Sequence, residues 1–212
     1  MFKKRHFIFA GILAIIIVLP ILSYLSVKSG AEVRRNVHAS AMYDSIGYTF
    51  PTFYFISHRG DTITSDKMHG KVIVLELFSA KCKDDPEKIT HPLFELQEDY
   101  NTKTLSLRFI SLITDSLYIN TDLEEYATRY AARDQWHVVH DTITTFNPVL
   151  QSYNQYLQKE GILNSNLSCP ENVLLIDKNG IVRGCYNIFD ELQYSDLYND
   201  ILFLIDKKYE SQ

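Results

Sequence analysis

The chain has 212 residues and a formal net charge of −5, and 46% of its residues are hydrophobic while 22% are charged. This composition is typical of a globular protein and excludes a disordered or collagen-like chain. The acidic balance argues against a nucleic-acid partner, which requires a basic face. The length is sufficient for one ordinary domain with a small appendage.

An apolar segment over residues 7–27 directly follows the basic cluster Lys3, Lys4 and Arg5. It contains about 20 residues without a charge, the length that spans the hydrocarbon core of a bilayer. Because it is longer than the apolar core of a signal peptide, we predict an uncleaved signal anchor, with a cleaved signal peptide as the alternative. Residues 1–6 are then a cytoplasmic tail. The soluble part lies on the periplasmic or equivalent extracytoplasmic side of the inner membrane.

Residues 28–46 are polar, with small residues and scattered charges, and we expect them to form a stalk or linker. Residues 47–212 are the predicted soluble domain. Their periodicity predicts, in chain order, a hairpin over 52–56 and 62–64, a buried strand over 71–78, a helix from about 84 to 100, a strand over 107–113, a helix over 122–133, a short strand over 136–139, a helix over 148–159, a hairpin over 173–176 and 181–186, and a helix over 190–208.

Three local details accompany these elements. The first long helix has an apolar stripe of Leu93, Leu96 and Tyr100, and Asp177–Gly180 indicates a type I′ turn in the last hairpin. The closing helix is amphipathic, and its expected inner stripe consists of Leu192, Leu197, Ile201, Leu204 and Ile205.

The order strand, helix, strand, helix, hairpin and final helix predicts a thioredoxin-like α/β fold with a central mixed sheet flanked by helices. Active groups in this layout lie in the loop after the first central strand, at the start of its helix. Here that loop spans residues 79–85 and contains Cys82, with Lys81 and Lys83 beside it. Positive charge and the helix dipole both stabilise a thiolate, so we expect a lowered pKa for Cys82. An inert loop cysteine is the alternative.

The soluble domain resembles the Sco/SenC family in several motifs. They include Gly70–Val74 before the loop, Phe109–Ser111 in the next strand, Leu175–Gly180 in the last hairpin and Arg183–Tyr186 after it. The resemblance implies a membrane-anchored, copper-handling protein of cytochrome oxidase assembly. Its partner would be an oxidase subunit or a redox protein.

The departures from the family fall on its copper ligands. The family binds copper through C-x-x-x-C-P in the loop and a histidine before the hairpin, and these positions hold Lys81, Asp85 and Cys169 here. A second alignment, with TlpA/ResA-like thioredoxins, makes Cys82 the nucleophile, and Asp85 again replaces the second cysteine. We therefore expect no copper site of the family's kind and no cofactor, with Cu(I) bound by two thiolates left open.

Cys169 is expected to lie on a loop facing Cys82 if the fold holds. The pair could be a structural disulfide, a redox couple or a two-thiolate site, whereas Cys185 lies in a strand and is expected to be a small core residue. His58 is expected to be solvated, and a metal shared by His137 and His140 is disfavoured because their segment is a predicted strand.

Three hypotheses for function follow. The first is a Sco/SenC-like protein with a degenerate copper site, acting in respiratory oxidase assembly or thiol redox maintenance. The second is an anchored thiol–disulfide oxidoreductase, TlpA/ResA-like or peroxide-handling, that uses Cys82 with Cys169. The third is a non-catalytic binding scaffold.

Overall fold

The computed structural model describes residues 16–26, 28–29, 48–78, 86–100, 104–113, 120–141, 154–155, 158–159 and 172–205. The chain divides into two compact units, Met1–Ala41 and Met42–Gln212.

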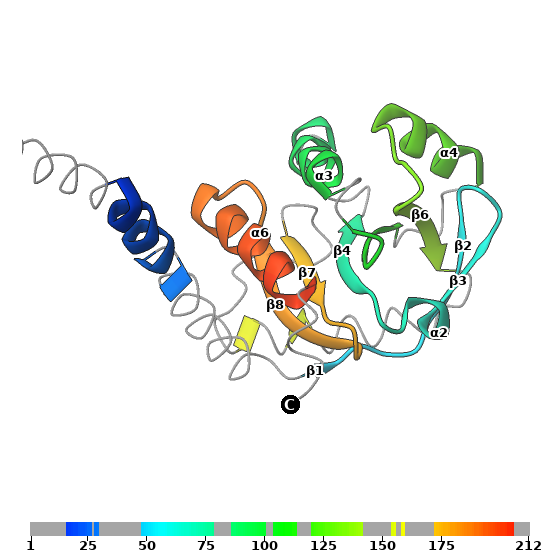
Figure 1. Cartoon of the computed structure of the whole chain (residues 1–212). Helices are drawn as coiled ribbons and strands as arrows, with labels where there is room; N and C mark the ends of the chain where they lie inside the picture. The colour runs from blue at the N-terminus through cyan, green and yellow to red at the C-terminus, as the bar shows by residue number, and fades with distance from the viewer. Residues whose placement is uncertain are drawn as a thin grey trace, which may run out of the picture. The chain divides into compact units, whose positions relative to one another are not determined.

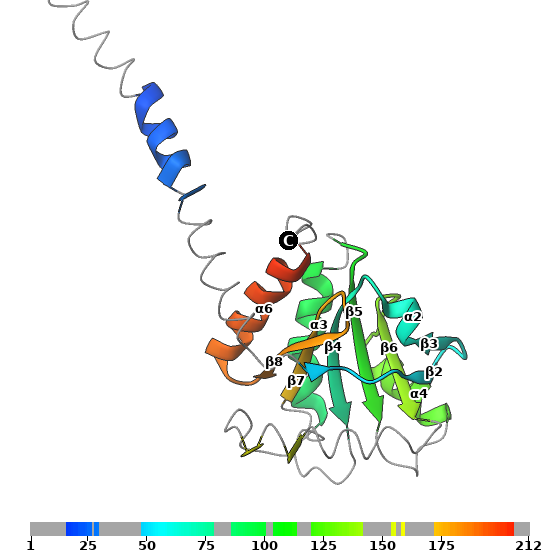
Figure 2. The same cartoon turned by 90° about the horizontal axis from the view of Figure 1, so that it is seen from below.

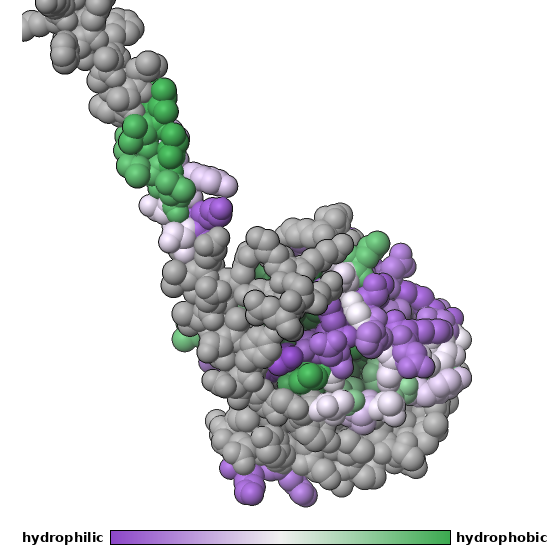
Figure 3. Space-filling model, turned by 60° about the horizontal axis from the view of Figure 1, so that its bottom comes forward, coloured by the Kyte–Doolittle hydropathy of each residue, from purple (hydrophilic) through white to green (hydrophobic). Residues whose placement is uncertain are grey.

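In the first unit, residues 16–26 form a helix whose apolar side chains are exposed, as the space-filling view in Figure 3 shows. Within the described ranges, no helix is both long enough and apolar enough to cross a bilayer. The predicted stalk and the predicted helix over 148–159 lie almost entirely outside the described residues.

The second unit is an α/β domain (Figure 1). Its elements are β1 (Tyr48–Thr49), β2 (Tyr54–Ser57), β3 (Thr62–Thr64), α2 (Ser65–Met68), β4 (Val72–Phe78), α3 (Pro86–Tyr100), β5 (Leu107–Ile113), α4 (Asn120–Arg129), β6 (Trp136–Asp141), β7 (Asn172–Ile176), β8 (Ile181–Asn187) and α6 (Glu191–Ile205).

The strands form one mixed sheet in the order β1-β8-β7-β4-β5-β6-β2-β3. Strands β4, β5 and β6 are parallel, and β7 joins β4 in antiparallel orientation. Strand β4 lies near the middle of the sheet because its run of β-branched and aliphatic residues is suited to burial on both faces. Figure 2 shows β4, β5 and β6 pointing the same way, so the loop over 79–85 leaves the end of the sheet at which all three strands finish.

Each face of the sheet has its own apolar core. Figure 1 shows α3, α4 and α6 on one face, where the stripe of Leu93, Leu96 and Tyr100 is buried as predicted. On the opposite face, the β2–β3 hairpin and α2 cover a cluster that includes Phe55, Ile63, Met68, Leu75, Leu77, Ile110, Leu112, Val139, Leu174 and Ile176. The parallel strands are therefore buried on both sides, as a parallel sheet requires.

Tyrosine hydroxyls connect α6 to its neighbours. Tyr100 on α3 donates a hydrogen bond to the carbonyl oxygen of Tyr198 at 3.1 Å, and the two rings lie 5.3 Å apart. Tyr186 on β8 donates to Asp200 Oδ2 at 2.6 Å in a buried position. These contacts fix the closing helix over the sheet by directional bonds as well as by apolar packing.

The expected stripe on α6 is only partly in the core. Leu197 and Ile201 are fully buried and Leu204 and Ile205 are partly buried, whereas Leu192 is 79% exposed. The reason is the start of the helix: Asp190 Oδ1 accepts hydrogen bonds from the backbone N–H groups of Leu192 and Gln193. Leu192 thus lies in the first turn, before the helix packs against the sheet.

The turn of the last hairpin differs from the predicted type I′. A type I′ turn needs positive φ at both central residues, Lys178 and Asn179, but only Gly180 has it, at +78°. Gly180 N–H donates to the Asp177 carbonyl oxygen, and Asp177 Oδ1 accepts from the N–H groups of Asn179 and Ile181. The aspartate side chain thereby favours a type I turn with glycine in the left-handed position.

Asp177 also pairs with Arg183 across this hairpin. Asp177 Oδ2 lies 2.6 Å from Arg183 Nη2 and 2.8 Å from Nε, and the two side chains are only 7% and 14% exposed. The carboxylate therefore satisfies a nearly buried guanidinium and two backbone donors at once.

We predict that Asp177→Ala lowers the free energy of unfolding by about 3 kcal/mol, because it removes the carboxylate that pairs with a largely buried guanidinium and accepts from two backbone N–H groups. Asp177→Asn keeps one acceptor oxygen and should lose less. Urea unfolding at neutral pH measures both changes, with Asp190→Asn as the control because asparagine caps helices equally well. A loss below about 1 kcal/mol for Asp177→Ala would contradict this role.

Candidate functional site

The residues predicted to carry the chemistry are not among those that the structure describes. Cys82, Cys169, Lys81 and Asp85 all lie outside the described ranges. Their roles therefore stay predictions. The described part of the site is the strand that leads into the loop, β4, with the side chains packed around its end.

A buried carboxyl group lies on β4, two residues before the strand ends. Glu76 is 0% exposed and faces α4. Its Oε2 atom accepts a hydrogen bond from Ser111 Oγ at 2.5 Å and one from the Tyr126 hydroxyl at 3.3 Å. Ser111 Oγ in turn accepts from Trp136 Nε1 at 2.9 Å. Four side chains from β4, β5, α4 and β6 thus form one buried polar chain.

The register of the sheet explains this arrangement. Glu76 is paired with Ser111 in the parallel β4–β5 ladder, and Ser111 is paired with Val138 in the β5–β6 ladder. Side chains paired in this way lie on the same face of a sheet. The carboxyl group and its hydroxyl partner therefore meet beneath the helical layer, where α4 brings Tyr126 to the same oxygen.

Burial raises the pKa of Glu76 from 4.5 to about 7, against the opposing effect of the hydrogen bonds from Ser111 and Tyr126. Its second oxygen, Oε1, has no hydrogen-bond partner within the described part of the chain. A carboxyl group with a pKa near neutrality can bind and release a proton at physiological pH. Glu76 is thus the described group best suited to exchange a proton with the loop that follows.

Sequence reasoning did not identify Glu76 as a functional candidate. The signal was nevertheless present, because a carboxylate interrupts the apolar run Val72–Phe78 at a strand expected to be buried on both faces. An ionisable side chain in such a run must either be paired or change its pKa. The partners Ser111 and Tyr126 come from other elements, so the sequence alone could not supply them.

Within the described part of the chain, His137 and His140 are not placed to share a metal ion. His137 is 7% exposed, burial lowers its pKa to about 4, and its Nδ1 atom lacks a partner among the described residues. His140 is three positions further along β6, so the two side chains point to opposite faces of the sheet. His58, expected to be solvated, instead accepts a hydrogen bond at Nδ1 from the Val138 N–H at 3.2 Å. Across the described ranges, no group of three or more His, Cys, Asp or Glu residues is placed to hold a metal ion.

Cys185 packs against the apolar core as expected for a small hydrophobic residue. Burial raises the pKa of its thiol to about 12. A thiol with so high a pKa is protonated at neutral pH and is a poor nucleophile. Any thiol chemistry of this chain therefore depends on Cys82 and Cys169.

The sheet order and the helix placement define the class of protein: this is a thioredoxin-like α/β fold. No protein-family model matches the sequence, and no curated protein matches it either.

Among solved structures, the chain is similar to BsSco, a member of the Sco family of cytochrome c oxidase assembly proteins. The TM-score is 0.60 at 18% identity, over 78% of this chain and 98% of that one. It is also similar to a SCO1/SenC family lipoprotein from Bacillus anthracis (TM-score 0.59, 19% identity, 76% of this chain and 97% of that one).

A thioredoxin-family thiol:disulfide interchange protein from Chlorobium tepidum is similar as well, with a TM-score of 0.53 at 15% identity over 77% of this chain and 99% of that one. The resemblance to Sco/SenC proteins that the sequence motifs indicated is thereby confirmed in the fold.

The residues at the three family ligand positions do not fit copper. A protonated lysine such as Lys81 cannot coordinate, the carboxylate of Asp85 is a hard ligand, and Cys169 alone supplies a soft thiolate. We predict that the reduced protein binds Cu(I) weakly or not at all in competition with a chelator. Tight one-to-one binding that is lost in Cys82→Ser and Cys169→Ser, and kept in Cys185→Ser, would contradict this prediction.

The pKa of Glu76 predicts how stability depends on pH. Between pH 4.5 and about 7 the carboxyl is protonated in the folded state and ionised in the unfolded state. The folded state then binds more protons, so the free energy of unfolding falls as pH rises through this range. Each pH unit lowers the free energy of unfolding by about 1.4 kcal/mol. Above about pH 7 the decrease stops, at a total of about 3 kcal/mol.

His137 acts in the opposite direction, because its pKa is lowered and the unfolded state binds more protons between pH 4 and 6.5. The wild-type curve therefore combines both effects, and the difference between wild type and Glu76→Gln isolates the carboxyl. We expect this variant to be similar to wild type at pH 5 and more stable by about 2–3 kcal/mol at pH 8 in urea unfolding. An equal difference at both pH values would show that Glu76 does not titrate in this range.

Proposed function

We propose that this chain is a membrane-anchored, extracytoplasmic thiol-redox protein of the Sco/SenC type that lacks the family's copper site. It keeps the thiols of a respiratory oxidase, or of a redox protein that serves it, in the required state during assembly. Cys82 is the nucleophile and Cys169 is the second thiol. The apolar run over 7–27 anchors the domain to the membrane.

The observation that carries this proposal is the buried carboxyl group of Glu76. It lies on the strand that leads into the loop, six residues before Cys82, with a pKa of about 7 and one oxygen without a hydrogen-bond partner among the described residues. A thiol must lose its proton before it attacks a disulfide. An acceptor that titrates near neutrality, at the end of β4, is suited to receive that proton. A purely structural core position would more simply hold an apolar residue.

The reaction is a thiol–disulfide exchange. The Cys82 thiolate attacks a disulfide of the partner, forms a mixed disulfide and releases one partner thiolate, which takes up a proton. The Cys169 thiolate then attacks Cys82 Sγ, which forms the Cys82–Cys169 disulfide and releases the second partner thiol. Two electrons and two protons pass from the protein to the partner. Glu76 accepts the proton of Cys82 and passes it to the first partner thiolate that is released, and the second partner thiolate takes up the proton of Cys169.

Two of the similar structures belong to proteins with thiol–disulfide chemistry, which supports this proposal. A disulfide switch has been identified in BsSco, and the Chlorobium tepidum protein is a thiol:disulfide interchange protein. Neither identity exceeds 20%, so these proteins support a class of chemistry and do not identify a partner.

The test is the pH dependence of Cys82 alkylation in a Cys169→Ser, Cys185→Ser background. We expect a pKa below the reference of about 8.5, raised by Lys81→Ala and lowered by Asp85→Ala. The profile should also show a second inflection near pH 7 that disappears in Glu76→Gln, because ionised Glu76 disfavours the thiolate. Glu124→Gln on the exposed side of α4 is the matched control and should keep both features.

A pKa at or above the reference value that is unchanged in every variant would contradict the redox proposal. The binding scaffold would then be the better description. A low pKa without an inflection near pH 7 would leave Cys82 a reactive thiol but would remove Glu76 from the mechanism.

A further inference from the structure

Two cations, one directly before β4 and one in β5, converge on one backbone oxygen at the end of the sheet where these strands begin. Lys71 Nζ donates to the Leu105 carbonyl oxygen at 3.1 Å, and Arg108 Nη1 donates to the same oxygen at 2.9 Å. Val72 N–H donates to the neighbouring carbonyl oxygen of Ser106, which fixes the turn against β4. We refer to Lys71, Leu105 and Arg108 as the entry surface.

The two charges of the entry surface have no carboxylate partner among the described residues. Other arginines of the domain are paired, for example Arg133 with Glu98 at 2.7 Å and Arg183 with Asp177. Among the residues that the structure describes, Lys71 and Arg108 bond to carbonyl oxygens alone, which satisfy donors but do not neutralise charge. Their positive charge is therefore available to an anionic partner.

The residue whose carbonyl oxygen binds both cations has an exposed apolar side chain. Leu105 is 74% exposed, although most of the described surface of the domain in Figure 3 is hydrophilic. A single exposed leucine is ordinary in a soluble protein. An exposed leucine next to two cations that lack a carboxylate partner in the described ranges is a combination that favours an anionic bilayer surface, where the apolar group enters the interface and the cations contact the headgroups.

The chain enters the domain at this same end. Tyr48 in β1 is paired with Val182 near the start of β8, and the Phe50 N–H donates to the Gly180 carbonyl oxygen. The turn that contains Gly180 is bonded to the segment before β4, because the Gly70 N–H donates to the Lys178 carbonyl oxygen. About 20 residues separate the apolar run over 7–27 from this entry point. A chain of that length spans at most about 70 Å when fully extended, so this end of the domain can reach the proposed bilayer.

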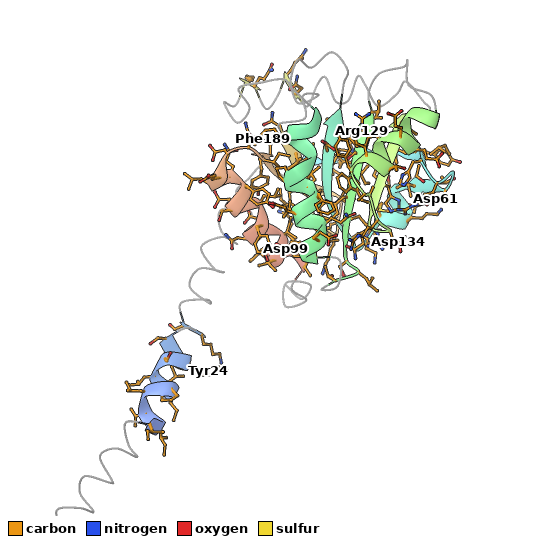
Figure 4. The ribbon with its side chains drawn as sticks, turned by 90° about the horizontal axis from the view of Figure 1, so that it is seen from above. Tyr24, Asp61, Asp99, Arg129, Asp134 and Phe189 are labelled. Atoms are coloured by element: carbon orange, nitrogen blue, oxygen red, sulfur yellow. The ribbon has the colours of Figure 1, made fainter. Side chains whose placement is uncertain are left out.

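We propose that the entry surface docks on the anionic bilayer in which the chain's own anchor is inserted. This inference rests on the anchor in the proposed function. Docking at this end directs the loop over 79–85 away from the bilayer, since that loop leaves the opposite end of β4. Figure 4 shows both ends of the domain: Asp99 and Asp134 lie at the end where β4 begins, and Phe189 lies at the end where β4 finishes. The redox loop would then face soluble domains of a partner about 20 Å from the headgroups.

The test uses the full chain in liposomes of phosphatidylcholine brominated on its acyl chains, with and without phosphatidylglycerol. Tryptophan is introduced as Leu105→Trp or, for comparison, as Leu192→Trp, because both leucines are similarly exposed and lie at opposite ends of the domain. The native Trp136 is fully buried and gives the same background in both variants. Quenching by bromine reports contact with the bilayer.

We expect Leu105→Trp to be quenched in liposomes that contain phosphatidylglycerol and Leu192→Trp not to be. High salt should abolish the quenching, and Lys71→Gln or Arg108→Gln should each weaken docking roughly fivefold. Arg129→Gln is the control, because this exposed arginine is already paired with Glu125. Equal quenching at the two positions, or quenching that ignores phosphatidylglycerol and salt, would overturn the proposal, as would the absence of quenching at position 105.

The anchor is tested separately by extraction with alkaline carbonate. A chain that resists extraction retains the anchor whatever the quenching shows. A chain that is extracted contradicts the anchor, while co-flotation with anionic liposomes and the two tryptophan variants still decide whether the entry surface binds lipid.

Discussion

Glu76 stands at the centre of the sheet, where β4 is covered on both faces and no water is available to solvate a charge. Its hydrogen bonds to Ser111 and Tyr126 tie together strands β4 and β5 and helix α4, and Trp136 extends the chain of bonds to β6. A buried polar network of this kind specifies the register of the strands, since a shift of one residue would separate the carboxyl from its donors. The same burial that fixes the architecture places a group with a near-neutral pKa beside the predicted redox loop.

The proposed redox site and the proposed bilayer contact lie at opposite ends of the strands. At the end of the sheet where β4 begins, the chain enters the domain at β1. At the same end, Lys71 and Arg108 both donate to the carbonyl oxygen of Leu105. At the other end, β4 passes into the loop that contains Cys82. A rigid parallel sheet between the two holds them apart, so neither end can approach the other without unfolding β4. The proposed redox site and the proposed bilayer contact are thus compatible in one molecule.

The fold could be predicted from the sequence because its signals are local and periodic. The stripe of Leu93 and Leu96 and the apolar run of β4 both followed directly from hydrophobic spacing. Where the prediction was wrong, a side chain had overridden the pattern: Asp190 caps α6 and leaves Leu192 in solvent, and Asp177 selects a type I turn. The polar network around Glu76 could not be predicted, because it joins residues from four elements whose alignment is set only by the folded sheet.

The outer edge of the sheet at β3 has a further consequence. An exposed edge strand presents unpaired backbone groups to which a strand of another molecule can add. This edge is only three residues long and passes at once into α2, and Lys67 donates from Nζ to the carbonyl oxygen of Thr62 at 2.7 Å. The lysine occupies an acceptor that an added strand would need and places a charge beside it. Polymerisation through this edge is therefore disfavoured, and copies of the protein can be crowded together without joining their sheets there.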